Sequence, residues 1–195
     1  MIETKMKHYD SLNELAEKNG IVIFGGSEDL DIPIGELRQA FAIDSKIYNR
    51  SVDELSIHNA INIYDTCVLP LMPETILIHI GSADLKNFEK DGITFDQKFR
   101  ELIAHIRLQN KTCRIAIISL KNYENNLTIA EMNKHLKYIA ESEHCEYGDI
   151  SSKRVWNPKG TKDAVSFVYS TGFIRPLKNK RPIYDLVKIF FFYEC

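Results

Sequence analysis

The sequence predicts an α/β protein, a three-layer α/β/α sandwich in which helices cover both faces of a doubly wound parallel sheet of five strands. Short runs of β-branched residues alternate along the chain with stretches in which apolar residues recur every three or four positions. This alternation is typical of β-α-β units, which build parallel sheets. An apolar content of 44% and a formal net charge of -2 over 195 residues are typical of a folded chain. We therefore expect one domain over residues 1–195, with a leading helix within 1–19 and an irregular loop region at 151–181.

Five segments have the composition of buried strands. The clearest are IVIF, which ends at Gly25 and Gly26, and RIAIISL in the second half of the chain. Both are rich in β-branched residues and too short for ordinary helices. The expected strands cover residues 21–24, 46–49, 75–80, 114–120 and 145–150.

The stretches between these strands have helical spacing. In the clearest, Phe95, Phe99, Leu102, Ile103 and Ile106 follow one helix face. The expected helices cover residues 10–18, 34–41, 52–71, 95–106, 129–140 and 183–191. In a doubly wound sheet, functional groups gather in the loops beyond the carboxyl ends of the strands. Those loops are expected at 25–31, 49–53, 81–90, 120–128 and 151–182.

Composition argues against several classes of protein. No apolar run approaches the ~18 residues that span a bilayer, and the polar start is unlike a signal peptide, so we expect no membrane contact and a cytoplasmic location. The near-zero net charge is unlike that of a nucleic-acid binder. The four cysteines form no Cys-x-x-Cys pair and are expected to be reduced and mostly buried. With no cluster at ligand spacing, we expect no metal and no cofactor, and the oligomeric state stays open.

The loop after the first expected strand, FGGSEDL, carries the most distinctive chemistry. Ser27 would present its hydroxyl at the edge of the sheet, where neighbouring amides can stabilise an oxyanion. The alternative is a glycine-rich turn in which Ser27, Glu28 or Asp29 caps the next helix. The loop has neither the Walker pattern nor the dinucleotide pattern of glycines.

Three blocks in this order resemble those of the SGNH (GDSL-type) hydrolases, a family of esterases, lipases and carbohydrate deacetylases. IVIFGGS resembles the first block, a strand followed by Gly-Asp-Ser, and would place Ser27 at the nucleophile position. YNRS at 48–51 resembles the second block, often Asn-Arg-Gly, and IHIGSAD at 78–84 resembles the third, Gly-x-Asn-Asp. The likeness extends over about residues 20–192. It implies a flavodoxin-like sheet with the strand order 2-1-3-4-5.

The sequence departs from this family pattern around the oxyanion. The family's Asp before the serine is Gly26, and the Gly of the second block is Ser51, whose backbone amide survives if the chain keeps its path. The third-block Asn, a side-chain donor, is Ala83, and losing one such donor typically costs about 10²–10³ in turnover. We expect Gly26, Ser51, Gly81, Ala83 and Asp84 to surround the oxyanion or a bound ligand, with Asp84 holding its loop through backbone amides.

The family's last block carries Asp-x-x-His before the final helix. Its best counterpart, STGFIRP at 170–176, has Thr171 in place of the acid and Ile174 in place of the base. No histidine follows His144, and a serine hydroxyl is a poor nucleophile without a base. Arg175 in the same segment could bind an anionic group if this loop folds over the serine.

Another histidine could replace the base. His79, in the third expected strand, is expected in the core, and His105 and His135 are expected in solvent on polar helix faces. His144 should lie at the amino end of the sheet, far from the serine. His58 follows the second block and could face the site.

Three functions remain open from the sequence. The first is an SGNH-like protein with lost or much reduced ester hydrolysis, which binds a small acyl or carbohydrate-like ligand in the ancestral cleft; the changes at Gly26, Ala83, Thr171 and Ile174 favour it. The second is an active serine esterase or deacetylase with a non-standard base beside Ser27. The third is a structural or assembly role for the aromatic C-terminal helix.

Overall fold

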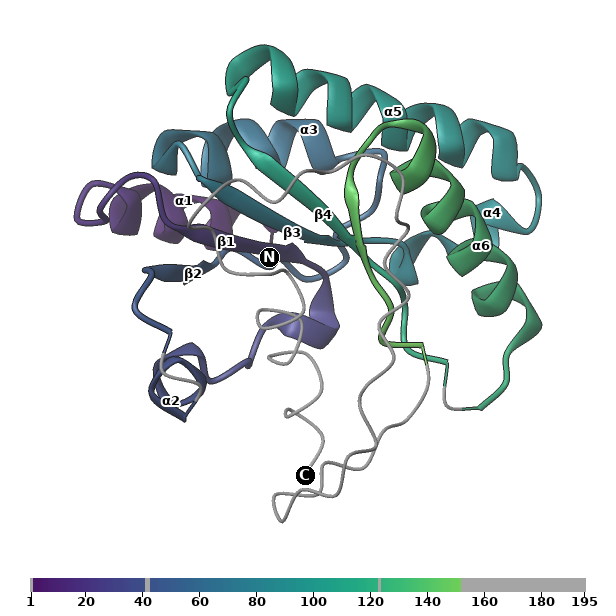
Figure 1. The fold of residues 1–195 in the computed structure, drawn as a ribbon, viewed down its shortest axis with the longest axis horizontal. Helices are drawn as coiled ribbons and strands as arrows, with labels where there is room; N and C mark the ends of the chain where they lie inside the picture. The colour runs from purple at the N-terminus through teal and green to yellow at the C-terminus, as the bar shows by residue number, and fades with distance from the viewer. Residues whose placement is uncertain (1, 41–42, 123, 152–195) are drawn as a thin grey trace.

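The computed structural model describes residues 2–40, 43–122 and 124–151, and it confirms the predicted α/β class with a parallel sheet (Figure 1). Its strands are β1 (Ile21–Gly25), β2 (Ile47–Asn49), β3 (Thr75–His79), β4 (Arg114–Ile118) and β5 (Glu146–Gly148). The strand order is β2-β1-β3-β4-β5 and every pair is parallel, as the resemblance implied. The carboxyl ends of the strands therefore share one edge, and Ser27 follows β1 at that edge.

Helices lie on both faces of the sheet (Figure 1). In the described part of the chain they are α1 (Ile2–Asn13), α2 (Ile34–Ala40), α3 (Ala60–Ile63), α4 (Leu85–Phe88), α5 (Gly92–Gln109) and α6 (Leu127–Ser142). One core joins α1, α3, α5 and α6 to strand residues such as Phe24 and Ile78. The opposite face, which includes Ile23 and Leu77, packs against α2. Every residue of β1 and β3 is buried, which explains why these strands are apolar without alternation.

The two long helices α5 and α6 were predicted well because their apolar periodicity coincides with side-chain caps. The Asp91 carboxylate accepts a hydrogen bond from Thr94 N at 3.0 Å at the start of α5. The Asn126 side chain accepts from Thr128 N and Ile129 N at the start of α6. The predicted apolar face of α5 is buried in full: Phe95, Phe99, Leu102, Ile103 and Ile106.

The first helix lies earlier in the chain than the predicted 10–18. Helix α1 runs from Ile2 to Asn13, because its apolar face is formed by Ile2, Met6 and Tyr9, which pack against the core and extend the helix toward the amino terminus. The buried Tyr9 hydroxyl donates to Ser51 O at 2.8 Å. Helix α1 is thereby attached to the loop that follows β2.

The helix predicted over 52–71 starts only with α3. The residues before α3 form turns because two of their amides bind side chains from other loops instead of helical carbonyls. Glu54 N donates to Ser27 Oγ, and Ile57 N donates to Asp84 Oδ2. These bonds hold the segment at the carboxyl edge of the sheet.

Several predictions concern parts of the chain outside the described residues, namely the loop region from residue 152 to 181, the helix at 183–191 and the assembly role based on it. Among the described residues, no helix is both long and apolar enough to cross a bilayer. The described cysteines Cys67, Cys113 and Cys145 are free thiols. Burial raises the pKa of Cys67 and of Cys145 to about 11, which keeps both in the unreactive thiol form.

Candidate functional site

Ser27 stands at the first position after β1 and Gly26, in a single 3-10 turn, Ser27–Asp29. Its side chain is exposed, while the flanking Gly26 is buried. The Ser27 hydroxyl donates to Asp53 Oδ1 at 2.5 Å, and Ser27 Oγ accepts from the backbone N–H of Glu54 at 3.2 Å. The serine therefore has a proton acceptor and a backbone donor on the same oxygen.

Glu54 supplies this donor through an unusual backbone conformation. Its φ is 54°, in the left-handed region that non-glycine residues seldom adopt. The sequence left the backbone amide of Ser51 as an oxyanion donor on the condition that the chain keeps the family's path, and in the structure Ser51 N donates to Asn49 Oδ1 at 2.9 Å. Ser51 is fully buried below the turn, so its amide has no access to a ligand.

The third block reaches the site from the end of β3. Gly81 is buried with a φ of 141°, and a Cβ there would lie 2.8 Å from Met132 Sδ, so the position requires glycine. A Cβ on Gly26 would lie 3.5 Å from Ser82 Oγ, which shows that this loop lies beside the serine turn. Ala83 is exposed and carries no polar group, so the side-chain donor expected at this point in the family is missing.

Asp84 joins two loops at the floor of the site. It is 1% exposed, and its Oδ2 accepts from Ile57 N at 3.0 Å, so it holds its loop through a backbone amide as expected. Burial raises the pKa of Asp84, although the Ile57 amide and His58 oppose the rise. Its Oδ1 is buried without a hydrogen bond from any described residue.

Below the serine turn lies a buried ion pair between Asp29 and His79. Asp29 Oδ2 lies 2.8 Å from His79 Nδ1, and both side chains are at most 2% exposed. Ser27, Glu28 and Asp29 were considered as caps, but the N-cap residue of the turn is Gly26, which has no side chain, and the Asp29 carboxylate is paired with His79. Gly25 makes room for it, since a Cβ at residue 25 would lie 1.9 Å from Asp29 Oδ2.

His79 is the core histidine that the sequence predicted. Burial by itself lowers the pKa of His79, but the charge and the hydrogen bond of Asp29 outweigh it and raise the pKa above the ordinary value. The imidazole therefore supports the turn from below, and the hydrogen-bond partner of Ser27 is Asp53 instead.

The histidines on α5 and α6 differ from the prediction. His105 and His135 are half-buried, not solvated, because each ring lies against a carboxylate. His105 Nε2 is 2.6 Å from Asp65, and His135 Nδ1 is 2.9 Å from Asp96. Both rings also make edge contacts with aromatic side chains. These histidines connect elements and stand apart from Ser27.

His58 borders a cavity of about 400 Å³ that Asp84 also lines. The remaining lining residues come from the loop and helices after β3: Asp84, Asn87, Phe88, Lys90, Asp91, Thr94 and Phe95. His58 is exposed, and His144 is exposed at the amino end of the sheet, as predicted. The described residues contain no group of three His, Cys, Asp or Glu side chains placed to hold a metal ion.

Three site residues of the sequence analysis, Thr171, Ile174 and Arg175, lie outside the described residues. The described residues bring together Gly26, Ser27, Asp53, Glu54 and Ser82. Sequence reasoning missed Asp53 and Glu54. The signal that could have found them is their position directly after the second block, where two acidic residues interrupt the apolar pattern.

Comparison with known proteins identifies the fold. No known family profile and no curated protein sequence matches this chain. Solved structures do match, among them a protein of Streptococcus pneumoniae named after platelet activating factor, with 15% identity, a TM-score of 0.66 and coverage of 76% of this chain and 74% of that one. A GDSL-like lipase of Bacteroides thetaiotaomicron has 12% identity and a TM-score of 0.58, and the match covers 74% of this chain and 77% of the lipase.

A variant of an acetyl-xylooligosaccharide esterase from Geobacillus stearothermophilus has 15% identity and a TM-score of 0.55, with coverage of 69% and 78%. Other neighbours are further GDSL-like lipases and acetylxylan esterases. The chain therefore has an α/β fold similar to that of these GDSL-like lipases and esterases.

Proposed function

We propose that this protein binds an acyl ester beside Ser27 and hydrolyses it far more slowly than a complete serine triad does. The observation that carries the proposal is the pair of hydrogen bonds at Ser27 Oγ. The hydroxyl donates to Asp53 Oδ1 at 2.5 Å, and Oγ accepts from Glu54 N at 3.2 Å. A nucleophile within hydrogen-bond reach of a proton acceptor is the geometry of covalent catalysis. The fold supports the same chemistry, since its neighbours include esterases and lipases.

The reaction follows from these contacts. Ser27 Oγ attacks the ester carbonyl carbon, and its proton passes to the Asp53 carboxylate. As Ser27 Oγ bonds to the carbonyl carbon, the Glu54 N–H turns from Oγ to the carbonyl oxygen and stabilises its negative charge. When the tetrahedral intermediate collapses, Asp53 returns the proton to the departing alkoxide. A water molecule then cleaves the acyl-serine by the same steps, with Asp53 again accepting and returning the proton.

Two features make this site slow. The Asp53 carboxylate replaces the histidine imidazole of a complete triad. A base is most effective when its pKa lies near the working pH, and acid–base catalysis by a well-matched group contributes about 10²–10⁴ in rate. Ala83 offers no side-chain donor to the oxyanion, which costs about 10²–10³. The missing donor alone therefore predicts turnover about 10²–10³ below that of a complete site, and the carboxylate base lowers it further.

The test is hydrolysis of p-nitrophenyl acetate by the full chain. We expect slow turnover that Ser27→Ala abolishes and that Asp53→Asn lowers by about 10²-fold. Asp31→Asn is the matched control, because Asp31 is an exposed carboxylate close to Ser27 in sequence. Turnover that survives Ser27→Ala, or that falls equally in both Asp variants, would contradict the proposal.

A second candidate function is binding without turnover. It is favoured by the missing donor at Ala83 and by the cavity at His58 and Asp84. It predicts saturable binding of an acetylated xylooligosaccharide in calorimetry together with no hydrolysis that depends on Ser27. Hydrolysis of that ligand during the titration would favour the first candidate instead.

A further inference from the structure

One side chain connects the two turns that meet at Ser27. Asn49 is the last residue of β2 and is half-buried. Its Nδ2 donates to Asp29 O at 2.6 Å, and its Oδ1 accepts from Ser51 N at 2.9 Å. The amide of Asn49 therefore uses both of its ends, each on the backbone of a different turn.

Both backbone partners belong to the site. Asp29 closes the turn that starts at Ser27, with Asp29 N donating to Gly26 O at 3.1 Å. Ser51 opens the turn that carries Asp53 and Glu54. The distance between the two turns sets the distance between the serine oxygen and its two partners.

The backbone hydrogen bonds between β1 and the chain after β2 end at the base of the two turns. The last backbone bond between β1 and the chain after β2 joins Val52 N to Gly25 O at 3.0 Å. That bond fixes Val52, next to Asp53, against Gly25. From Gly26 to Asp29 the serine turn is further connected to the Asp53 turn by side chains, namely Asn49 and the contacts of Ser27 itself. Asn49 bonds to the backbone of both turns and not to the Ser27 hydroxyl, so it acts on the serine by placing the turns around it.

We propose that Asn49 is a positioning residue, which fixes the serine turn against the turn of Asp53 and Glu54. This inference rests on the proposed function for its kinetic consequence. Displacing reacting groups by about 1 Å can cost 10²-fold in rate. Loss of the Asn49 amide should therefore lower kcat by about 10–100-fold and leave KM within about twofold, because the substrate pocket is unchanged.

The matched control is Asn133. Its side chain makes the same pair of bonds to one backbone residue, accepting from Leu120 N at 2.7 Å and donating to Leu120 O at 2.8 Å. This bond pair lies in the loop after β4 and touches neither Ser27 nor Asp53. Asn133→Ala should cost similar stability and leave kcat unchanged.

The experiment compares Asn49→Ala, Asn49→Asp and Asn133→Ala with the unmodified chain. Asn49→Asp keeps the acceptor for Ser51 N and removes the donor to Asp29 O, whereas Asn49→Ala removes both, so the two variants separate the contributions of the two bonds. Kinetics with p-nitrophenyl acetate give kcat and KM. The amide proton shift of Glu54 in NMR gives a second measure, for which Ser27→Ala provides the reference of a broken bond.

In both Asn49 variants we expect kcat to fall and the Glu54 shift to move toward its value in Ser27→Ala. Equal behaviour of the Asn49 and Asn133 variants in kcat and in this shift would overturn the positioning role. If the unmodified chain shows no turnover that depends on Ser27, the proposed function fails, and the Glu54 shift alone decides the role of Asn49.

Discussion

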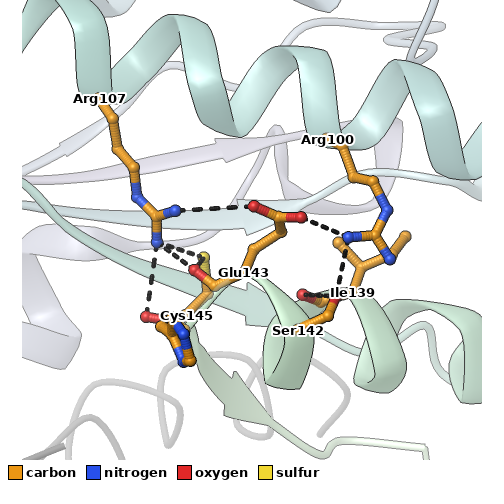
Figure 2. A network of polar contacts seen from close by, with 7 residues as sticks. Arg100, Arg107, Ile139, Ser142, Glu143 and Cys145 are labelled. Atoms are coloured by element: carbon orange, nitrogen blue, oxygen red, sulfur yellow. Dashed lines mark hydrogen bonds and ion pairs between the residues drawn. The ribbon is translucent and has the colours of Figure 1, made fainter.

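Two polar clusters lie at opposite ends of the sheet, and their partners differ in burial. The Glu143 cluster lies at the amino end of the sheet and joins the second half of α5 to the chain at and after the carboxyl end of α6 (Figure 2). Its members are Arg100, Arg107, Ser142, Glu143 and Cys145. Arg100 pairs with the Glu143 carboxylate and donates to Ser142 Oγ at 2.8 Å. Arg107 donates to Glu143 O and lies 3.5 Å from Cys145 Sγ. The charged side chains of Arg100, Arg107 and Glu143 are partly exposed, so water shares in their solvation, whereas Cys145 is buried.

The cluster around Ser27 lies at the carboxyl end and is buried below its surface. Asp29 and Asp84 are each 1% exposed, and each has one carboxylate oxygen without a hydrogen bond from the described residues. Glu54 adopts a left-handed backbone conformation beside them. Such features cost folding free energy, since buried charge and strained backbone are both unfavourable.

The contrast indicates what each end contributes. Half-exposed ion pairs such as those of Glu143 cost little and stabilise little. Buried carboxylates are retained where the protein needs their charge in place, as at functional sites. We therefore expect substitutions at the amino end of the sheet to cost little free energy of unfolding, and substitutions around Ser27, at the carboxyl end, to cost more.

The largest effect is expected from Gly25→Ala. The new Cβ would lie 1.9 Å from Asp29 Oδ2, so the buried pair with His79 must separate. Breaking such a pair costs about 3–5 kcal/mol of the free energy of unfolding. Urea denaturation measures this loss.

Gly35→Ala is the control for that variant. Gly35 lies in α2 with open space around its Cβ position, and alanine is the better helix former. We expect a gain of about 0.4–1 kcal/mol. Similar losses in the two variants would show that the Asp29 pair is not what makes residue 25 sensitive.

The next effect is a dependence of stability on pH that comes from His79. Asp29 raises the pKa of His79 in the folded state, although burial opposes the rise. A raised histidine pKa adds stability below about pH 6.5 that is lost as the pH rises through the folded pKa. Free energies of unfolding at pH 6 to 9 should therefore decline, by less than Gly25→Ala costs, because the hydrogen bond to neutral imidazole remains.

Asp29→Asn supplies the comparison for this pH series. It keeps an acceptor for His79 Nδ1 and removes the charge that raises the pKa of His79. The decline above pH 6.5 should disappear in this variant. An identical decline in both proteins would assign the effect to other groups.

Asp84 should show a smaller effect with a different sign. Burial raises its pKa, so the ionised form destabilises the fold at neutral pH, and this cost disappears as the pH falls below the folded pKa. Asp84→Asn keeps the acceptor for Ile57 N and should be as stable as the unmodified chain at pH 7, or more stable. Asp84→Ala loses that acceptor and should cost about 1–3 kcal/mol in thermal or urea unfolding. A greater loss for Asn than for Ala would refute this account.

The two ends also differ in how far the sequence predicts them. The strands and α5 and α6 follow from apolar periodicity, because their burial depends on neighbours three or four residues away or on continuous runs. The start of α3 does not, because Ile57 and Glu54 give their amides to Asp84 and Ser27, which lie 27 residues away. Local patterns contain no information about such partners.

Within the site, the place of Ser27 followed from a strand that ends in two glycines. The roles of Asp53 and Glu54 could not be predicted in this way. A left-handed backbone conformation is usually recognised in a sequence by a glycine, and residue 54 is a glutamate. The Asp29 pair depends on register, because β1 and β3 place Gly25 opposite His79. A glycine facing a histidine across a sheet, with an aspartate four residues later, is a pattern that sequence reading could use.

The smallest effect is expected in the Glu143 cluster. Glu143→Gln removes the charge that pairs with Arg100 and Arg107 and leaves the backbone carbonyl to which Arg107 donates (Figure 2). The Glu143 side chain is 28% exposed, so water replaces much of the lost interaction. We expect a loss of about 0.2–1 kcal/mol in urea unfolding, which shrinks further in high salt. A salt-independent loss above about 2 kcal/mol would mean that substitutions at the amino end of the sheet cost as much stability as those around Ser27, and the expected difference between the two ends would be wrong.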